Sequence, residues 1–222
     1  MGLADLDDAH QKFSGSTLEE IVSQLEEDIV LGELLPRERL VEDALLARFD
    51  TKRHVIRQAL MELDRMGLIE RVPNRGAQVR AYSALEVEQL YELRELLETQ
   101  AALQIRFPVD PAALAELEAI QAGHDRSVRD VDYAGIFRSN LAFHKLLFSL
   151  CANPFLAEAI DSASQRAHSI RFAALKDAQA RETARNEHHA MIDALKQGDG
   201  ALLARLCRAH LPTSKTFYLK TR

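Results

Sequence analysis

Cysteine and long apolar runs are both scarce in this sequence. Cys151 and Cys207 are the only cysteines in 222 residues, too few for a disulfide scaffold, so the reducing cytoplasm is the expected location. No apolar run approaches the roughly 20 residues that a membrane-spanning helix needs, which predicts that the protein has no membrane partner. The first stretch, MGLADLDDAHQKF, is polar and acidic and contains no apolar signal region.

The net charge of −6 argues at first against a nucleic-acid partner, but it conceals an uneven distribution. Residues 37–80 contain ten Arg or Lys and seven Asp or Glu, a net charge of +3, so the rest of the chain carries −9. Within them, residues 51–60 hold Lys52, Arg53 and Arg57 and no acid. This local positive charge is what a DNA contact requires. The chain is otherwise typical of a globular protein, with 47% hydrophobic and 28% charged residues, and its length predicts two domains.

Hydrophobic periodicity predicts a winged helix-turn-helix domain in residues 16–80. Ser16 and Glu19 form a capping box that predicts a first helix, and Gly32 ends that helix. Gly67 ends a third helix, which carries the acid-free basic segment. Three short helices followed by a β-hairpin are typical of the winged form of this domain. The remaining elements are predicted as helices at 40–48 and 51–66, strands at 68–72 and 77–80, and a turn at 73–76.

The third predicted helix has the width of the major groove, and its N-terminal residues would reach base edges. Arg53 and Arg57 lie one turn apart, so both can face the DNA, where an arginine grips guanine through two hydrogen bonds. The alternative is that these two arginines only solvate an exposed helix face. Arg39, Lys52 and Arg75 are predicted to contact phosphates. The predicted DNA-binding residues are Arg39, Lys52, Arg53, His54, Arg57, Arg75 and Gly76.

Residues 84–222 are predicted to form an antiparallel α-helical bundle that binds a ligand and a metal. A linker at 81–83 joins this bundle to the first domain, and residues 1–15 form an N-terminal tail. Ser83 and Glu86 make a second capping box at the start of the bundle. No strand pattern competes with the helical periodicity. Helices are predicted at 84–106, 111–129, 132–151, 154–176, 179–197 and 199–219.

Three histidines lie on apolar helix faces and would point into the bundle. His188 and His210 lie ten and eleven residues from the two ends of the turn at 198–199, so both sit about 15 Å from that turn on adjacent helices. With His144 from a neighbouring helix they would form a set of metal ligands, and Asn140, one turn earlier, would add a carboxamide oxygen. The alternative is that these histidines are hydrogen-bonded core residues.

The segment ERLVEDALLARFDTKRHVIRQALMELDRMGLIERVPNRGAQV resembles the DNA-binding domain of GntR-type bacterial regulators. The resemblance covers roughly residues 17–80. It includes the Arg39-Leu40 pair, the arginines of the third helix and the Arg75-Gly76 pair. Arg37 stands where the family usually has glycine, and Lys52 where it usually has serine or threonine. The resemblance implies a protein that recognises double-stranded operator DNA.

The segments LYELRELLETQAA, NLAFHKLLFSLCANPFL, EHHAMIDALKQGD and ARLCRAHL resemble the FCD ligand-binding domain of the FadR-like branch of GntR regulators. In many such proteins an aspartate and three histidines hold a metal, and a small organic acid binds beside it. His144, His188 and His210 match the three histidine positions, and Asn140 stands at the aspartate position. The resemblance implies a divalent transition metal, with zinc first and nickel or manganese as alternatives, and a small carboxylate effector.

Arg94 has two interpretations: it neutralises an effector carboxylate, or it pairs with Glu98 one turn on. The leading functional hypothesis is a ligand-responsive transcription regulator, a repressor or an activator, that is not an enzyme. As a homodimer it would bind a pseudo-palindromic operator through two winged domains. A metal-sensing repressor without an organic effector is the first alternative. A zinc-dependent hydrolase is the second, although the sequence has no HExxH motif.

Overall fold

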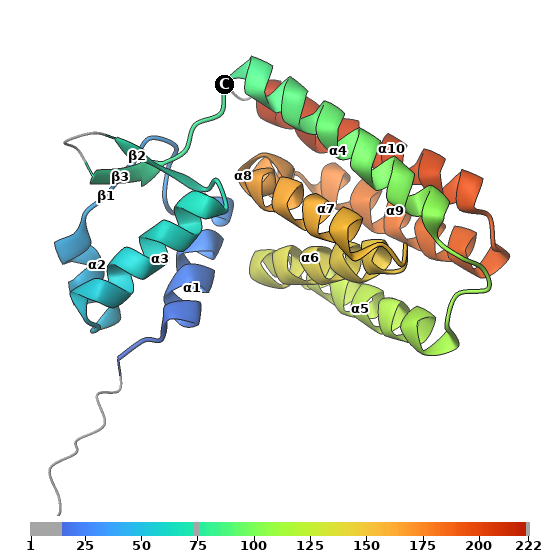
Figure 1. Ribbon diagram of the computed structural model, residues 1–222, viewed down its shortest axis with the longest axis horizontal. Coiled ribbons are helices and arrows are strands. Elements are labelled where there is room, and N and C mark those ends of the chain that lie inside the picture. The colour runs from blue at the N-terminus through green and yellow to red at the C-terminus, as the bar shows by residue number, and fades with distance from the viewer. Residues whose placement is uncertain (1–14, 73–75, 221–222) are drawn as a thin grey trace, which may run out of the picture.

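The computed structural model describes residues 15–72 and 76–220 and shows a winged domain beside a bundle of helices (Figure 1). The predicted fold class, mainly α with a winged helix-turn-helix before an antiparallel helical bundle, is confirmed. The three strands form an antiparallel sheet in the order β1-β3-β2. The elements of the N-terminal domain are α1 (Leu18–Leu31), β1 (Arg39–Leu40), α2 (Glu42–Phe49), α3 (Arg53–Arg65), β2 (Ile69–Val72) and β3 (Gly76–Val79).

The capping box of α1 lies one residue later than predicted. The Thr17 hydroxyl accepts a hydrogen bond from the Glu20 amide at 3.2 Å, and the Glu20 carboxylate accepts one from the Thr17 amide at 2.8 Å. The prediction of Ser16 and Glu19 was wrong because the Ser16 amide is engaged elsewhere, with the carbonyl oxygen of Phe49. Both registers satisfy the sequence pattern, so only this tertiary contact decides between them.

The second predicted helix, 40–48, begins too early. Arg39 and Leu40 form β1 instead, and they pair with Gln78 and Ala77 of β3. A two-residue strand has no periodicity that a sequence can reveal, so β1 was absent from the prediction. Its consequence is that the sheet has three strands and that Arg39 is fixed beside the wing.

Arg37 adopts a backbone φ of 68°, in the left-handed region that favours glycine. This conformation explains why related sequences usually place glycine here. The Arg37 amide donates to the carbonyl oxygen of Val79 at 2.9 Å, which holds the loop before β1 against β3. This position therefore requires a left-handed backbone conformation and not a particular side chain, and the Arg37 side chain is exposed.

The core of the N-terminal domain is built from the predicted apolar faces of α1 and α3. Ile21, Leu25, Ile56 and Leu63 are completely buried. Burying each such side chain stabilises the domain by about 1.5–3 kcal/mol. Because one face of α3 is fixed in this core, its opposite face, with the basic residues, must point to the outside.

The bundle confirms the predicted helices except at 154–176, where the chain breaks into three short elements. The break follows Ala167, which accepts hydrogen bonds from the amides of both Ile170 and Arg171. It contains no proline or glycine, so the sequence carries no signal for it. The elements are α4 (Ala84–Gln104), α5 (Pro111–Asp130), α6 (Tyr133–Ser149), α7 (Pro154–Arg166), α8 (His168–Arg171), η1 (Phe172–Ala174), α9 (Ala178–Gln197) and α10 (Gly200–Lys220).

Helix α1 lies on the side of the N-terminal domain that faces the bundle (Figure 1). Glu26 Oε1 lies 2.6 Å from His168 Nδ1 of α8. Arg138 Nη1 of α6 donates to Glu27 Oε2 at 2.7 Å. The two domains are therefore joined through α1 by polar contacts and an apolar cluster. That cluster consists of Val30 from α1 and Val128, Ile136, Phe137 and Leu175 from the bundle.

Candidate DNA-binding face and buried histidine site

The N-terminal part of α3 and the wing form an exposed face of the N-terminal domain. Arg53, His54 and Arg57 are exposed on α3, and Arg39 is exposed on β1. The backbone therefore places these four predicted residues where a DNA duplex could reach them. A groove of about 780 Å³ beside the wing is lined in part by Arg39, Arg57, Arg71 and Gly76.

Two further predicted DNA-binding residues lie at the edges of this face. Lys52 is the exposed N-cap residue of α3. Gly76 begins β3 with a φ of 82°, in the left-handed region that favours glycine. Arg75 lies outside the described residues.

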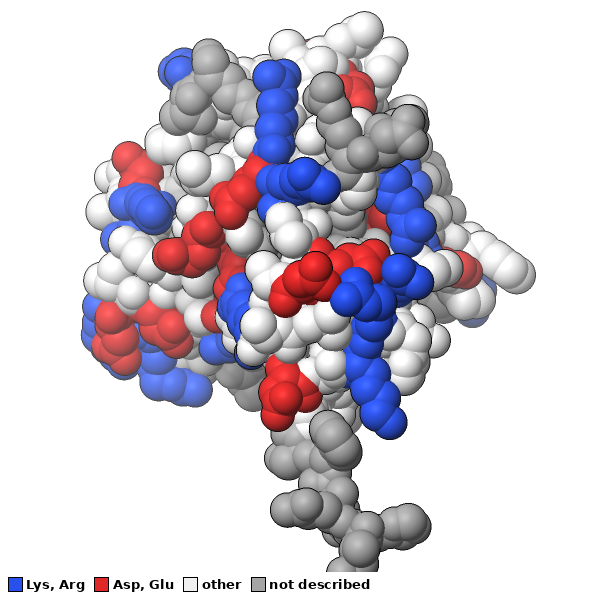
Figure 2. All heavy atoms as spheres, turned by 90° about the vertical axis from the view of Figure 1, so that its left-hand side faces the viewer, with Lys and Arg blue, Asp and Glu red and all other residues white. Residues whose placement is uncertain are grey.

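The arginines of α3 are paired with acids from α2. Arg53 Nη2 donates to Asp43 Oδ1 at 2.7 Å, and Arg57 Nε donates to Glu42 Oε2 at 3.2 Å. The bond to Asp43, with Glu42 beside it, raises the pKa of Arg53. Figure 2, in which the side of the molecule on the left of Figure 1 faces the viewer, shows basic and acidic side chains next to one another on this face. Residues 51–60 contain no acid, but acids of the separate helix α2 lie beside this segment in the folded protein. Their proximity could not be predicted from the sequence of the segment alone.

The three predicted histidines converge inside the bundle. His144 of α6, His188 of α9 and His210 of α10 each offer a ring nitrogen, and these nitrogens lie within 4.8 Å of one another. The ring centroids are 5.1 Å apart for His144 and His188, 5.1 Å for His144 and His210, and 5.3 Å for His188 and His210. His188 is fully buried, and the His210 side chain is 10% exposed. His188 and His210 lie at similar distances from the α9–α10 turn on adjacent helices, and their rings therefore meet, as predicted.

Neighbouring side chains orient two of these rings. His188 Nδ1 lies 3.0 Å from the amide oxygen of Gln121, and His210 Nδ1 lies 2.6 Å from the carboxylate of Glu187. An oxygen acceptor at Nδ1 holds the proton there and leaves the Nε2 lone pair for a metal. The Nε2 of His188 and both ring nitrogens of His144 have no hydrogen-bond partner among the described residues.

Burial keeps the imidazoles of His144 and His188 in the neutral form. It lowers the pKa of His144 and of His188 well below the usual value, and nearby positive charge acts in the same direction. Metal binding requires neutral imidazole, so protons do not compete for these nitrogens near neutral pH. Three converging imidazoles, two of them oriented by oxygen acceptors, fit a divalent transition metal.

Asn140 lies one helical turn before His144, as predicted, but its amide is engaged. Its Oδ1 accepts a hydrogen bond from Arg171 Nη1 at 3.4 Å. Asparagine cannot ionise, so Asn140 offers no negative charge to balance a dication. Its side chain instead binds the guanidinium of Arg171 on α8.

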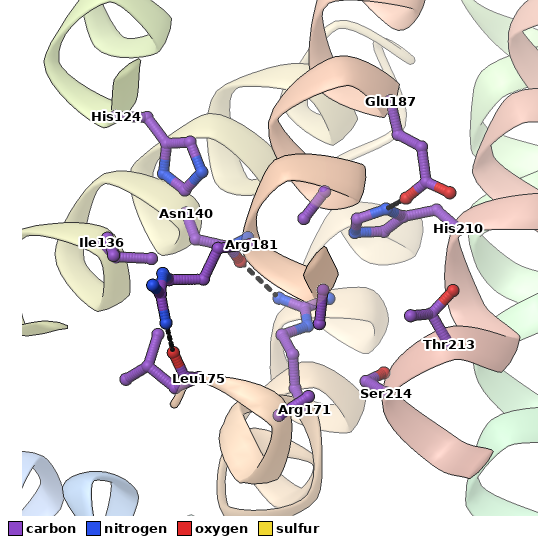
Figure 3. A pocket seen from close by; sticks show the side chains of 13 residues that line it. His124, Ile136, Asn140, Arg171, Leu175, Arg181, Glu187, His210, Thr213 and Ser214 are labelled. Atoms are coloured by element: carbon purple, nitrogen blue, oxygen red, sulfur yellow. Dashed lines mark hydrogen bonds and ion pairs between the residues drawn. The ribbon is translucent and has the colours of Figure 1, made fainter. Parts of the chain in front are cut away.

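A cavity of about 70 Å³ lies beside the histidines (Figure 3). Arg171 reaches it from α8, and burial lowers the pKa of its guanidinium to about 10, so it remains charged at neutral pH. Arg171 Nη2 has no acceptor in the part of the chain that the structure describes. The cavity therefore presents a buried cation that forms no ion pair within the described residues. The polar side chains that line it include His124, Asn140, Arg171, Arg181, Glu187 and His210.

Arg94 pairs with Glu98, as the second of its two interpretations predicts, and its role toward an effector stays a prediction. Its Nε donates to Glu98 Oε1 at 2.9 Å, and both side chains are 1% exposed. Arg94 Nη1 and Nη2 find no acceptor among residues 15–72 and 76–220. The lining of the cavity includes Arg171 but not Arg94, so the guanidinium that reaches the cavity is that of Arg171.

Residues 89–213 match the FCD domain, and residues 17–79 match the bacterial regulatory proteins of the gntR family. The FCD match alone covers more than half of the chain. The chain belongs to the GntR family and carries an FCD domain. It is a transcriptional regulator, and the relatives that it matches are transcriptional regulators rather than enzymes.

The similarity of this GntR regulator to known proteins extends along most of its length. The HTH-type transcriptional regulator YdhC of Bacillus subtilis (strain 168) is 26% identical over 176 residues, or 79% of each protein. The HTH-type transcriptional repressor RspR of Escherichia coli (strain K12) is 23% identical over 193 residues, covering 87% of this chain and 85% of RspR. The structure of E. coli McbR/YncC covers 93% of this chain and 98% of its own, with 19% identity and a TM-score of 0.79, and so shows a shared fold.

Two residues of the regulator's site were missed by sequence reasoning. His124 was detectable, because Leu117, Gln121, His124 and Val128 recur at helical spacing and are all buried on α5. Arg171 could not be identified from the sequence, because it follows a helix break at Ala167 that no proline or glycine marks. Across the described parts of the chain, the structure contains no helix long and apolar enough to cross a membrane.

Proposed function

We propose that this GntR regulator binds a pseudo-palindromic DNA operator as a homodimer and that a small organic acid, bound beside a metal, modulates this binding. The observation that carries the proposal is the convergence of His144, His188 and His210 next to the buried guanidinium of Arg171, which forms no ion pair within the described residues. Such a pair of features suits an anionic ligand better than a neutral one.

The three histidines would hold the metal through their unprotonated ring nitrogens. A bound divalent cation would supply an electrophilic centre for a carboxylate oxygen of the effector. Arg171 Nη2, buried and without an acceptor in the described chain, would pair with another oxygen of the same ligand. An effector carboxylate would thus provide the negative charge that Asn140 does not.

Helix α8 supports a route from this cavity to the DNA-binding domain. Its last residue, Arg171, lines the cavity, and its first residue, His168, contacts Glu26 of α1 at 2.6 Å. One short, rigid turn therefore touches both the effector cavity and the DNA-binding domain. Pairing of Arg171 with an effector would shift α8, and α1 would move with it. The coupling is allosteric because the effector would have different affinities for the two arrangements.

The homodimer is proposed to form through α4, which packs on α10 at the edge of the bundle (Figure 1). Several leucines of α4 are exposed, although leucine is most often buried. Their spacing along the helix keeps them on one side of it. A two-fold axis beside this stripe would cover it and would pair the two winged domains for a symmetric operator. The leucines are Leu85 (66% exposed), Leu93 (46%), Leu96 (71%) and Leu103 (53%).

Operator binding and its response to acids test this function directly. Duplexes selected from a random pool by the full-length protein are expected to contain an inverted repeat and to bind a dimer in fluorescence anisotropy. Two- to four-carbon acids, added to the zinc-loaded protein, are expected to change that affinity about fivefold or more. A change with zinc alone and none with any acid would favour the metal-sensing alternative. Absence of a selected sequence would contradict the proposal.

The route through α8 predicts that Glu26→Gln uncouples the two sites. Acid affinity should stay within about twofold, whereas the acid-induced change in operator affinity should shrink at least about threefold, because the charged contact with His168 is weakened. The measurement is operator anisotropy at several acid concentrations. The matched control is Glu27→Gln, which removes the neighbouring contact with Arg138 but leaves α8 intact. Equal behaviour of the two variants would contradict the route.

A further inference from the structure

His124 is a buried histidine that belongs to the same cavity but not to the three-histidine set. It lies on α5, is 1% exposed, and its ring centroid is 5.1 Å from that of His188. Among the described residues, the group whose ring nitrogens all lie within 4.8 Å of one another contains His144, His188 and His210 but not His124. A separate role for His124 therefore has to be sought at the cavity.

The hydrogen bonds around His124 determine which ring nitrogen carries the proton. Ser139 Oγ lies 2.6 Å from the carbonyl oxygen of Gly135 and 3.0 Å from His124 Nδ1. A carbonyl oxygen can only accept, so the single hydroxyl proton of Ser139 goes to Gly135. His124 Nδ1 must then be the N–H that donates to Ser139. The Nε2 of His124 is left with a lone pair, and it is buried without a partner among the described residues.

The other unsatisfied groups of the cavity are donors. Arg171 Nη2 and Arg181 Nε are buried and lack acceptors within the described chain. The Glu187 carboxylate is engaged with His210 Nδ1 at 2.6 Å. Figure 3 shows His124 and Arg171 on different sides of the cavity. A ligand that satisfies both must carry an anionic group and a hydrogen-bond donor.

We propose that His124 selects effectors that carry a hydroxyl group beside their carboxylate. Its Nε2 accepts a hydrogen bond from the hydroxyl, while the guanidinium of Arg171 pairs with the carboxylate. This inference rests on the proposed function of the cavity as the effector site. The class of ligand is a 2-hydroxy acid, which places its donor and its anionic group on adjacent carbons.

The size of the cavity agrees with a short acid of this class. Its volume is about 70 Å³, and a single water needs roughly 10–15 Å³ on the same measure, so the cavity holds about five or six non-hydrogen atoms. A three-carbon 2-hydroxy acid has about that many. An acid without the hydroxyl would leave His124 Nε2 buried and unsatisfied, which lowers affinity about 5- to 150-fold.

The test compares 2-hydroxypropionate with propionate by isothermal titration calorimetry on the zinc-loaded, full-length protein. The wild-type protein is expected to bind 2-hydroxypropionate at least about tenfold more tightly, and His124→Leu to bind both acids equally. His124→Gln, which restores an acceptor oxygen, should recover part of the preference. His189→Leu removes an exposed histidine and should keep the full preference. Circular dichroism melts verify that each variant is folded.

The outcomes separate this inference from the proposed function. Equal affinity of the wild-type protein for the two acids would overturn the role of His124 and leave the carboxylate site standing. Loss of zinc from His124→Leu, read by metal analysis of the same samples, would make His124 a metal ligand and would also overturn it. Binding of neither acid by the wild-type protein would overturn both the inference and the acid-binding part of the proposed function.

Discussion

Replacing His188 with alanine is expected to reduce the metal content of the regulator from about one ion per chain to almost none, while His189→Ala keeps it. The two residues are neighbours in sequence but lie in different environments. His188 is fully buried beside the other two ligands. His189 has a side chain that is 49% exposed and pairs with Asp125 at 3.0 Å. Loss of an outer-shell partner alone costs about 10- to 100-fold in metal affinity, and loss of a ligand costs more.

The measurement is elemental analysis of untagged protein after incubation with zinc, nickel or manganese and removal of the free ion. His188 also stacks on Phe143, with ring centroids 4.1 Å apart, so alanine leaves a gap in the core. His188→Gln fills more of that gap and should lose the metal as well. Equal metal content in the His188 and His189 variants would contradict the site. If the wild-type protein takes up none of the three metals, Asn140 has removed the metal site and the histidines are polar core residues or direct effector contacts.

The position of the histidine cluster was predictable because it depends on a local rule. His188 and His210 lie equally far from one tight turn, and a fixed rise per residue places them side by side on paired helices. The buried faces of α1 and α3 were predictable for a similar reason, since a helical period determines which side chains share a face. Both results need only residues close to one another in sequence.

The features that the sequence did not reveal depend on contacts between distant segments. The pairing of Arg39 with Gln78 creates β1, and the acids of α2 pair with arginines ten to fifteen positions later. Arg171 enters the cavity only because the chain breaks at Ala167 without a local signal. Arg94 shows the limit in another way: two partners were plausible in sequence, and only packing showed that Glu98 is the one it contacts.

Arg57→Ala is expected to weaken operator binding by about 1–3 kcal/mol and to relax the choice of sequence at one position of each half-site. The reason is that Arg57 lies one turn into α3, with a side chain that is 61% exposed beside the wing groove. In the free protein its guanidinium pairs with Glu42, and this pair must open or rearrange on DNA. An exposed ion pair contributes about 0–1 kcal/mol, less than a bidentate contact with guanine provides. Arg57 is therefore expected to leave Glu42 and bind guanine when DNA is present.

Arg65→Ala is the matched control, because Arg65 is an equally exposed arginine at the opposite end of the same helix and pairs with Glu62. Fluorescence anisotropy with the selected operator, and with variants of each base pair, should show a loss of affinity and selectivity for Arg57→Ala alone. A loss of affinity that is uniform across sequences would make Arg57 a phosphate contact instead. Unchanged affinity would remove it from the interface. The acids of α2 would then be its permanent partners, as the interpretation of a merely solvated helix face predicts.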